Sequence, residues 1–96
     1  MIKHEYADYH TMEVAASPDT VTSVATCLYG FAVETDQTND VTLVISDGST
    51  EVLTYIVTGT TDSFVHEFTV PVMLRHGLTI TLTGTASRCV VLYRKL

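Results

Sequence analysis

The side chains best suited to chemistry in this 96-residue chain lie close together near its N-terminus. They are His4, Glu5, Asp8, His10 and Glu13. Nitrogen and oxygen ligands at such spacing can bind a divalent cation. A metal site also needs further contacts that hold its ligands in place, and a flexible arm supplies none by itself. We therefore expect a solvated or partner-contacting segment here and no metal centre.

A second acidic group lies in a turn and contains Glu34, Asp36, Asn39 and Asp40. The group resembles a loose calcium loop, because carboxylate and amide oxygens are the ligands that calcium prefers. Its spacing does not match the D-x-[DN]-x-[DN]-G pattern of such loops, and exposed acids are ordinary in turns. We expect a turn without a bound ion.

A third group combines His66 and Glu67 with His76. Adjacent residues of a strand point to opposite faces, so His66 and Glu67 cannot share a site within one chain. His66 shares its face with Phe64 and Phe68, which favours a histidine of the core or of an interface over a general base.

The sequence contains no motif of a known catalytic or cofactor site. G-x-S-x-G, P-loop, H-E-x-x-H and glycine-fingerprint patterns do not occur. Cys27 and Cys89 lie in strand-like segments without C-x-x-C spacing, so we expect two reduced thiols that are not nucleophiles. We predict that the protein is not an enzyme and has no cofactor.

The composition favours an all-β protein with neither nucleic acid nor membrane as a partner. Thr, Val and Ile, which are β-branched and prefer strands, supply 34 of the 96 residues. Eleven acids against five bases give a net charge of −6, which repels phosphate backbones. No apolar run approaches the ~20 residues of a membrane helix.

The regular alternation of polar and apolar residues begins after Ser17-Pro18, where we place a boundary. Residues 1–18 are expected to form an N-terminal arm, with one short strand around residues 9–14. Residues 19–96 show no helical period and have turn residues between strands at 8–14-residue spacing. Six or seven such strands predict a single antiparallel β-sandwich of jelly-roll-like type.

Three positions should interrupt the strands. Residues 20–35 are predicted as one long strand, apolar on both faces and thus central or packed on both sides, with a bulge or bend at Gly30. Asp47-Gly48 predicts a hairpin turn, since glycine tolerates positive φ. Pro71 cannot donate to a ladder and should interrupt its strand.

The expected core is the apolar side of each alternating strand: Val21, Tyr29, Phe31, Leu43, Ile45, Phe68, Ile80, Leu82 and Leu92. Outward positions are rich in Thr and poor in Lys, which leaves edge strands unguarded apart from Pro71. Such faces suit packing against copies of the same chain. Tyr55, His66 and Arg94 are the candidate residues of that interface.

The order of several short motifs is similar to that of a known family. LYGF (28–31) is followed by ISDG (45–48), PV (71–72), GLTI (77–80), GTA (84–86) and VVLYR (90–94). In that order they resemble small β-sandwich virion structural proteins of tailed bacteriophages, over about residues 20–94. Cys89 and the arm rich in His and acids depart from the pattern.

The resemblance implies a non-enzymatic capsid decoration (cement) or head-fibre protein, synthesised in the host cytoplasm and located on the capsid surface. It would stabilise the head between major capsid protein subunits as a homo-oligomer, with a trimer favoured. We expect Tyr6, Tyr9 and Met12 of the arm to contact that partner. Deletion of residues 1–17 should then abolish capsid binding and leave the melting temperature within a few degrees.

Other readings stay open. One is a head–tail connector component. Another is a carbohydrate- or receptor-binding module at a fibre tip that uses exposed Tyr6, Tyr9 or Tyr55. A small hydrolase or metal enzyme is the reading that the residues favour least.

Overall fold

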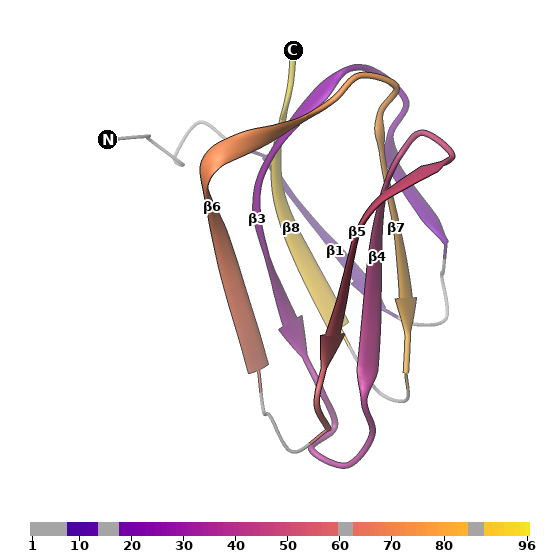
Figure 1. Ribbon diagram of the computed structural model, residues 1–96, viewed down its shortest axis with the longest axis vertical. Coiled ribbons are helices and arrows are strands. Elements are labelled where there is room, and N and C mark those ends of the chain that lie inside the picture. The colour runs from indigo at the N-terminus through magenta and orange to yellow at the C-terminus, as the bar shows by residue number, and fades with distance from the viewer. Residues whose placement is uncertain (1–7, 14–17, 60–62, 85–87) are drawn as a thin grey trace.

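The chain folds into eight β-strands in the computed structural model, which describes residues 18–59, 63–84 and 88–96 and the backbone of residues 8–13 (Figure 1). The strands are β1 (Asp8–Glu13), β2 (Asp19–Thr22), β3 (Thr26–Glu34), β4 (Val41–Asp47), β5 (Thr50–Val57), β6 (Ser63–Leu74), β7 (Leu78–Thr83) and β8 (Arg88–Lys95). The prediction of one strand over residues 20–35 is wrong. The chain breaks at residues 23–25, and the two halves, β2 and β3, belong to different sheets.

The strands form two antiparallel four-stranded sheets, as expected for a β-sandwich. Sheet A has the order β1-β8-β3-β6, and sheet B has the order β2-β7-β4-β5. The chain therefore pairs β4 with β5, β3 with β6, β2 with β7 and β1 with β8, like one long hairpin rolled up on itself. This arrangement is the eight-stranded jelly roll.

The short strand expected around residues 9–14 is confirmed as β1, and it is part of sheet A. Its backbone pairs with β8 from Asp8 opposite Tyr93 to Glu13 opposite Arg88. The boundary predicted at residue 18 stays a prediction, but deletion of residues 1–17 would remove an edge strand and uncover β8. We therefore replace the expectation of unchanged stability with an expected loss of stability.

The core lies between the inner faces of the two sheets. Its fully buried side chains include Leu28, Phe31, Leu43, Ile45, Leu74, Leu78, Ile80, Leu82 and Val91. Burial of each such side chain stabilises the fold by about 1.5–3 kcal/mol relative to its exposure. Of the predicted core, Phe31, Leu43, Ile45, Ile80 and Leu82 are confirmed as buried, whereas Val21 and Phe68 are partly buried and pack against it.

Two predicted core residues, Tyr29 and Leu92, are only partly buried, and that prediction is wrong. A bulge between Leu28 and Gly30 shifts the register of β3 against both β6 and β8, so Leu28 and Phe31 point inward and Tyr29 points outward. Leu92 pairs with Gly30 on the outer side, because β8 turns Cys89 and Val91 into the core.

The bulge expected at Gly30 is thus confirmed, and the packing explains the glycine. A Cβ at this position would lie 2.6 Å from the backbone oxygen of His66 on β6, closer than real Cβ atoms approach. Any side chain here would push β6 away from β3.

Strand β6 is bent where Pro71 was expected to interrupt it. Val72 pairs with Leu28 and Glu67 pairs with Gly30, so residues 68–71 have no partner residue on β3. Figure 1 shows the resulting corner, where β6 turns and crosses over the end of the sandwich. Pro71, which lacks an N–H, lies in this unpaired part.

Candidate interaction surface

The acidic turn between β3 and β4 uses its carboxylates to fix the backbone. The N–H groups of Thr38 and Asn39 donate to Asp36 Oδ1 at 2.9 and 2.8 Å, and Asn39 Nδ2 donates to Asp36 Oδ2 at 2.8 Å. These bonds, that of the Asn39 N–H first, lower the pKa of Asp36. The Gly59 N–H donates to Asp40 Oδ1 at 2.7 Å, which joins the turn to the end of β5.

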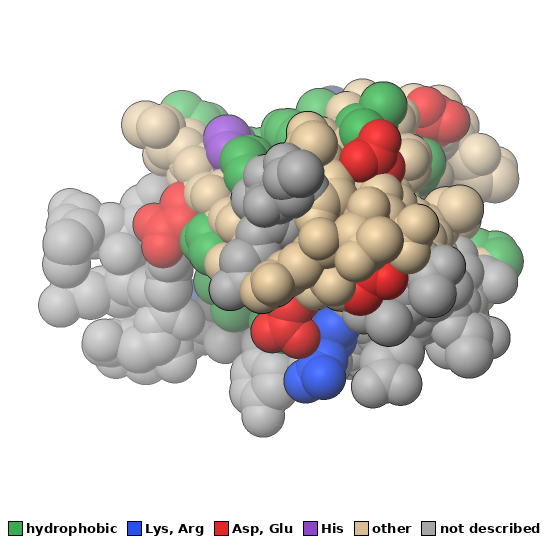
Figure 2. Space-filling model, turned by 90° about the horizontal axis from the view of Figure 1, so that it is seen from below, with side chains coloured by type: hydrophobic (Ala, Val, Ile, Leu, Met, Phe, Trp, Pro, Cys, Tyr) green, Lys and Arg blue, Asp and Glu red, His purple; other side chains and the backbone are tan. Residues whose placement is uncertain are grey.

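The end of the sandwich that carries this turn is shown in Figure 2, where acidic side chains are spread among neutral polar atoms. Within the described part of the chain, no group of three or more His, Cys, Asp or Glu side chains is placed to hold a metal ion. The acidic N-terminal group, from His4 to Glu13, lies outside the described side chains.

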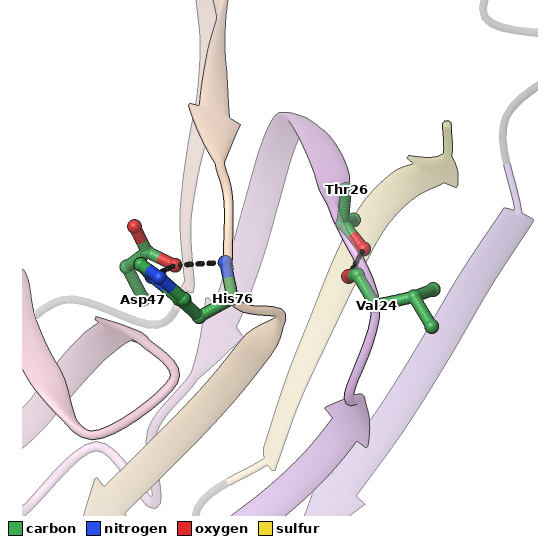
Figure 3. Close-up of polar contacts among 4 residues, drawn as sticks. All are labelled: Val24, Thr26, Asp47 and His76. Carbon is green, nitrogen blue, oxygen red and sulfur yellow. Dashed lines mark hydrogen bonds and ion pairs between the residues drawn. The ribbon is translucent and has the colours of Figure 1, made fainter.

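The opposite end contains a contact between two turns. The His76 N–H donates to Asp47 Oδ1 at 2.6 Å, and His76 Nδ1 lies 3.5 Å from the same oxygen (Figure 3). The hydrogen bond from the His76 backbone is the main cause of a lowered Asp47 pKa. Gly48, at φ 63° in the predicted hairpin turn, donates from its N–H to the Gly77 carbonyl at 3.2 Å. These contacts fix the β4–β5 hairpin against the β6–β7 turn.

A buried threonine, Thr26, lies at the end of the segment that joins β2 to β3. The Thr26 hydroxyl donates to the Val24 carbonyl at 2.7 Å, so the side chain is paired although it is fully buried (Figure 3). This bond shapes the break between β2 and β3.

Five rings form a cluster where the edge strands β5 and β6 meet across the sandwich. Phe31 lies at its centre, with ring centroids 4.7 Å from Tyr55, 6.0 Å from Phe64, 5.7 Å from His66 and 6.2 Å from Phe68. The face predicted for His66 is confirmed. The expectation that Tyr55 is exposed is wrong, because β5 turns its ring inward onto Phe31. A platform for stacking sugars is therefore poorly presented at Tyr55.

The two cysteines are free and lie in different surroundings. Cys89 is fully buried, and burial raises its pKa to about 12, so it is not a nucleophile near neutral pH. Cys27 is partly exposed on the outer side of β3. Cys89 pairs with Val33, six residues along β3 from Cys27, which is about 20 Å at strand spacing and excludes a disulfide.

The outer face of sheet A gathers apolar side chains from three neighbouring strands. Strands β3, β6 and β8 place there Cys27, Tyr29, Ala32, Val65, Met73, Val90 and Leu92. Val65 and Met73 are 66% and 51% exposed. We call this surface the apolar face. A continuous apolar patch of this kind is typical of an interaction site.

Four charged side chains accompany the apolar face. Glu34 and Arg88 form an ion pair at 3.7 Å at one end of it. Glu67 and Arg94 lie on either side of β3 toward the other end; both are exposed, and neither is ion-paired with another described residue. Among the described side chains of this face, two acids therefore balance two bases, on a chain whose net charge is −6.

The outer face of sheet B is different in character. It mixes threonines with apolar side chains, in rows such as Thr81 beside Val44 beside Thr54, and Ile56, opposite Thr42, is 69% exposed. Thr20, Thr42, Ser46, Thr79 and Thr83 continue the same surface. The threonines expected at outward positions thus lie mainly on sheet B.

The residues proposed from sequence for partner contacts are separated by the fold. Arg94 lies on the apolar face, whereas His66 and Tyr55 belong to the ring cluster inside the edge of the sandwich. Tyr9 and Met12 lie in β1 opposite Leu92 and Cys89, and nothing further is described of them. Tyr6 lies outside the described residues.

Comparisons of this chain with protein-family models, with curated proteins and with solved structures give no match. In the part of the chain that the structure describes, no helix has the length and hydropathy needed to cross a membrane.

Sequence reasoning missed the apolar face, although a signal for it was present. Residues 26–34 are apolar on both sides, which indicates a strand that is central in its sheet, packed against other groups on both faces, or both. Strand β3 is indeed central, between β8 and β6. Its second apolar side belongs to the surface where Val65 and Met73 are exposed.

Proposed function

We propose that this chain is a non-enzymatic structural protein of a bacteriophage virion, a decoration (cement) protein that binds the capsid surface as a homo-oligomer. The observation that carries the proposal is the outer face of sheet A, where three strands gather apolar side chains, among them the exposed Val65 and Met73, while threonine is the commonest outward residue of sheet B. A protein with such faces works by presenting a surface to other proteins, and it keeps the other face in water.

Three further points support a role on a virion. The eight-stranded jelly roll is a recurrent architecture of viral capsid proteins. The net charge of −6 suits the outside of a particle, because such a protein does not compete for the packaged genome. The order of the strand and turn motifs resembles that of small tailed-phage virion proteins.

Four titratable groups of the described residues have structural uses that fit this role. Asp36, Asp40 and Asp47 accept hydrogen bonds that hold turns, and Cys89 is buried. The proposal assigns no reaction and no cofactor to them. The capsid contact is assigned to the N-terminal residues that contain Tyr6, and the major capsid protein is the proposed partner.

Particles from a phage in which the gene for this chain has been deleted provide the test. Purified full-length chain should co-sediment with these particles at saturable stoichiometry and raise the temperature at which they release DNA. A chain that lacks residues 1–7 keeps β1 and should fold equally well, but it should bind much more weakly. Failure of the full-length chain to bind any particle would overturn the virion role. Full binding by the shortened chain would overturn only the assignment of the contact.

A further inference from the structure

We propose that the apolar face pairs two copies of this chain face to face about a two-fold axis, with Glu67 of each copy against Arg94 of the other. The inference rests on the homo-oligomer of the proposed function and identifies its contact surface, but it does not depend on the virion role. The resemblance favours a trimer, whereas the charges of this face favour two copies.

The positions of the two unpaired charges carry the argument. Glu67 lies opposite Gly30 on one side of β3, and Arg94 lies opposite Cys27 on the other side. Their Cα atoms are separated by two inter-strand spacings across the sheet and by about two residues along the strands. The resulting distance along the face is about 12 Å. A two-fold axis that lies parallel to the face, passes midway between them and is perpendicular to the line that joins them places each acid over the partner's base. One surface thereby complements itself, as an isologous interface requires.

The distance between packed sheets suits this contact. Face-to-face sheets lie about 10 Å apart, which an arginine and a glutamate reaching toward each other can span. Between the two charge pairs lie Cys27 and Leu92, with Met73 near one side, so the centre of the interface is apolar and its charges lie outside that centre.

Charge also favours a second copy over another partner at this face. Two chains of net charge −6 repel each other over most of their surfaces. The described charges of the apolar face balance, with Glu34 already paired to Arg88 and with Glu67 and Arg94 available to pair across the interface. A partner of strongly basic or acidic chemistry would find no matching excess of charge there.

Charge reversal tests the pairing directly. Glu67→Arg or Arg94→Glu alone sets like charges opposite each other and should weaken dimerisation by about tenfold or more in sedimentation equilibrium. The double variant Glu67→Arg/Arg94→Glu should restore it to within about threefold of the wild type. Glu51→Arg and Arg75→Glu reverse exposed charges elsewhere and serve as matched controls that should dimerise normally. Far-UV circular dichroism and the melting temperature of each variant report on folding.

Cys27 provides a second readout that needs no charge change. It lies on β3 close to the proposed axis, so the two copies of Cys27 should face each other, whereas Cys89 is buried and unreactive. A short bis-maleimide should therefore link the wild type into a covalent dimer, and Cys27→Ser should abolish the product.

The result expected is a wild-type dimer, weakened by each single reversal and restored by the double. A wild type that stays monomeric up to about 0.5 mM, a trimer mass, single reversals without effect, equal weakening by the controls, or absence of the cross-linked product would each overturn the proposal. Capsid binding by a chain that stays monomeric would leave the virion role intact while refuting this interface.

Discussion

Replacement of Phe31 by alanine tests the interior of the sandwich most severely. The side chain is 2% exposed and lies at the centre of the five-ring cluster, with the Tyr55 centroid 4.7 Å away. The bulge at Gly30 brings it there, because it shifts the register of β3 by one residue. Phe31→Ala therefore removes the ring on which both edge strands pack.

The expected magnitude follows from burial and from the ring contacts. Truncation of a buried Phe to Ala costs about 3–5 kcal/mol, and aromatic pairs contribute about 0.5–1.5 kcal/mol beyond their buried area. A domain of this length is stable by about 5–15 kcal/mol, so the variant should lose a large part of its stability. Phe31→Leu keeps most of the apolar volume and should lose about 1–2 kcal/mol.

Urea unfolding followed by far-UV circular dichroism measures this loss, with the chain dilute enough to be monomeric. Val44→Ala is the control, because Val44 lies on the outer face of sheet B among threonines and should cost about 1 kcal/mol or less. A loss from Phe31→Ala below about 1 kcal/mol at unchanged m-value, or one equal to that of the control, would refute the inward placement of Phe31.

Four further predictions follow from the fold. Ile80→Ala should lower the free energy of unfolding by about 2–4 kcal/mol in the same urea assay, because Ile80 is fully buried. A loss under about 0.5 kcal/mol would show that Ile80 does not point into the core. Gly30→Ala should lower the melting temperature by at least several degrees, since its Cβ would meet the His66 carbonyl at 2.6 Å; an unchanged melting temperature would contradict the packing of β6 on β3. The pKa of Asp47 is lowered in the folded state, so its carboxylate stabilises the fold at pH values above 3.8, the ordinary pKa of the group. This stabilisation is lost as the pH falls through the lower pKa of the folded state. Melting temperatures should thus fall more steeply from about pH 5 to pH 2 in the wild type than in Asp47→Asn, and parallel profiles would contradict the role of its hydrogen bond with His76. Deletion of residues 1–17 should lower the melting temperature more than deletion of residues 1–7 does, because only the longer deletion removes β1; equal effects would contradict the pairing of β1 with β8.

The architecture could be predicted from sequence because alternation and turn chemistry are local. Thr79, Thr81 and Thr83 alternate with Leu78, Ile80 and Leu82, and the structure turns the two sets to opposite sides of β7. Asp47-Gly48 marked its hairpin for the same reason, since positive φ at Gly48 is a property of one residue. Local rules thus gave the fold class and most of the strands.

Register and sheet membership could not be predicted in the same way, because they depend on contacts between distant residues. Tyr29 and Phe31 share a face in an ideal strand. Gly30 indicated a bulge or bend between them, but only the pairing with β6 and β8 shows which of the two residues points inward. The run from Cys89 to Tyr93 is apolar throughout, so its inward side cannot be identified without a partner strand. The break between β2 and β3 leaves the alternation nearly intact although the chain changes sheets there.

The apolar face could not be predicted from the sequence for a related reason. Val65, Val90 and Leu92 lie on two strands far apart in the sequence, and no spacing shows that β3 brings them onto one face. Arg94 was proposed as an interface residue from sequence, and it does lie on that face. Tyr55 and His66 were proposed with it, but both belong to the ring cluster. For His66, the face that it shares with Phe64 and Phe68 already favoured the core or an interface, whereas nothing indicated this for Tyr55.

Cryo-electron microscopy of the virion, with and without the gene for this chain, tests the central claim most directly. We predict discrete density on the outside of the capsid shell into which the eight-stranded sandwich fits, absent from particles of the deletion phage and regained when purified chain is added. A shell that is identical in the two particles, or density that persists after deletion, would contradict the claim that this chain is a structural protein of the virion.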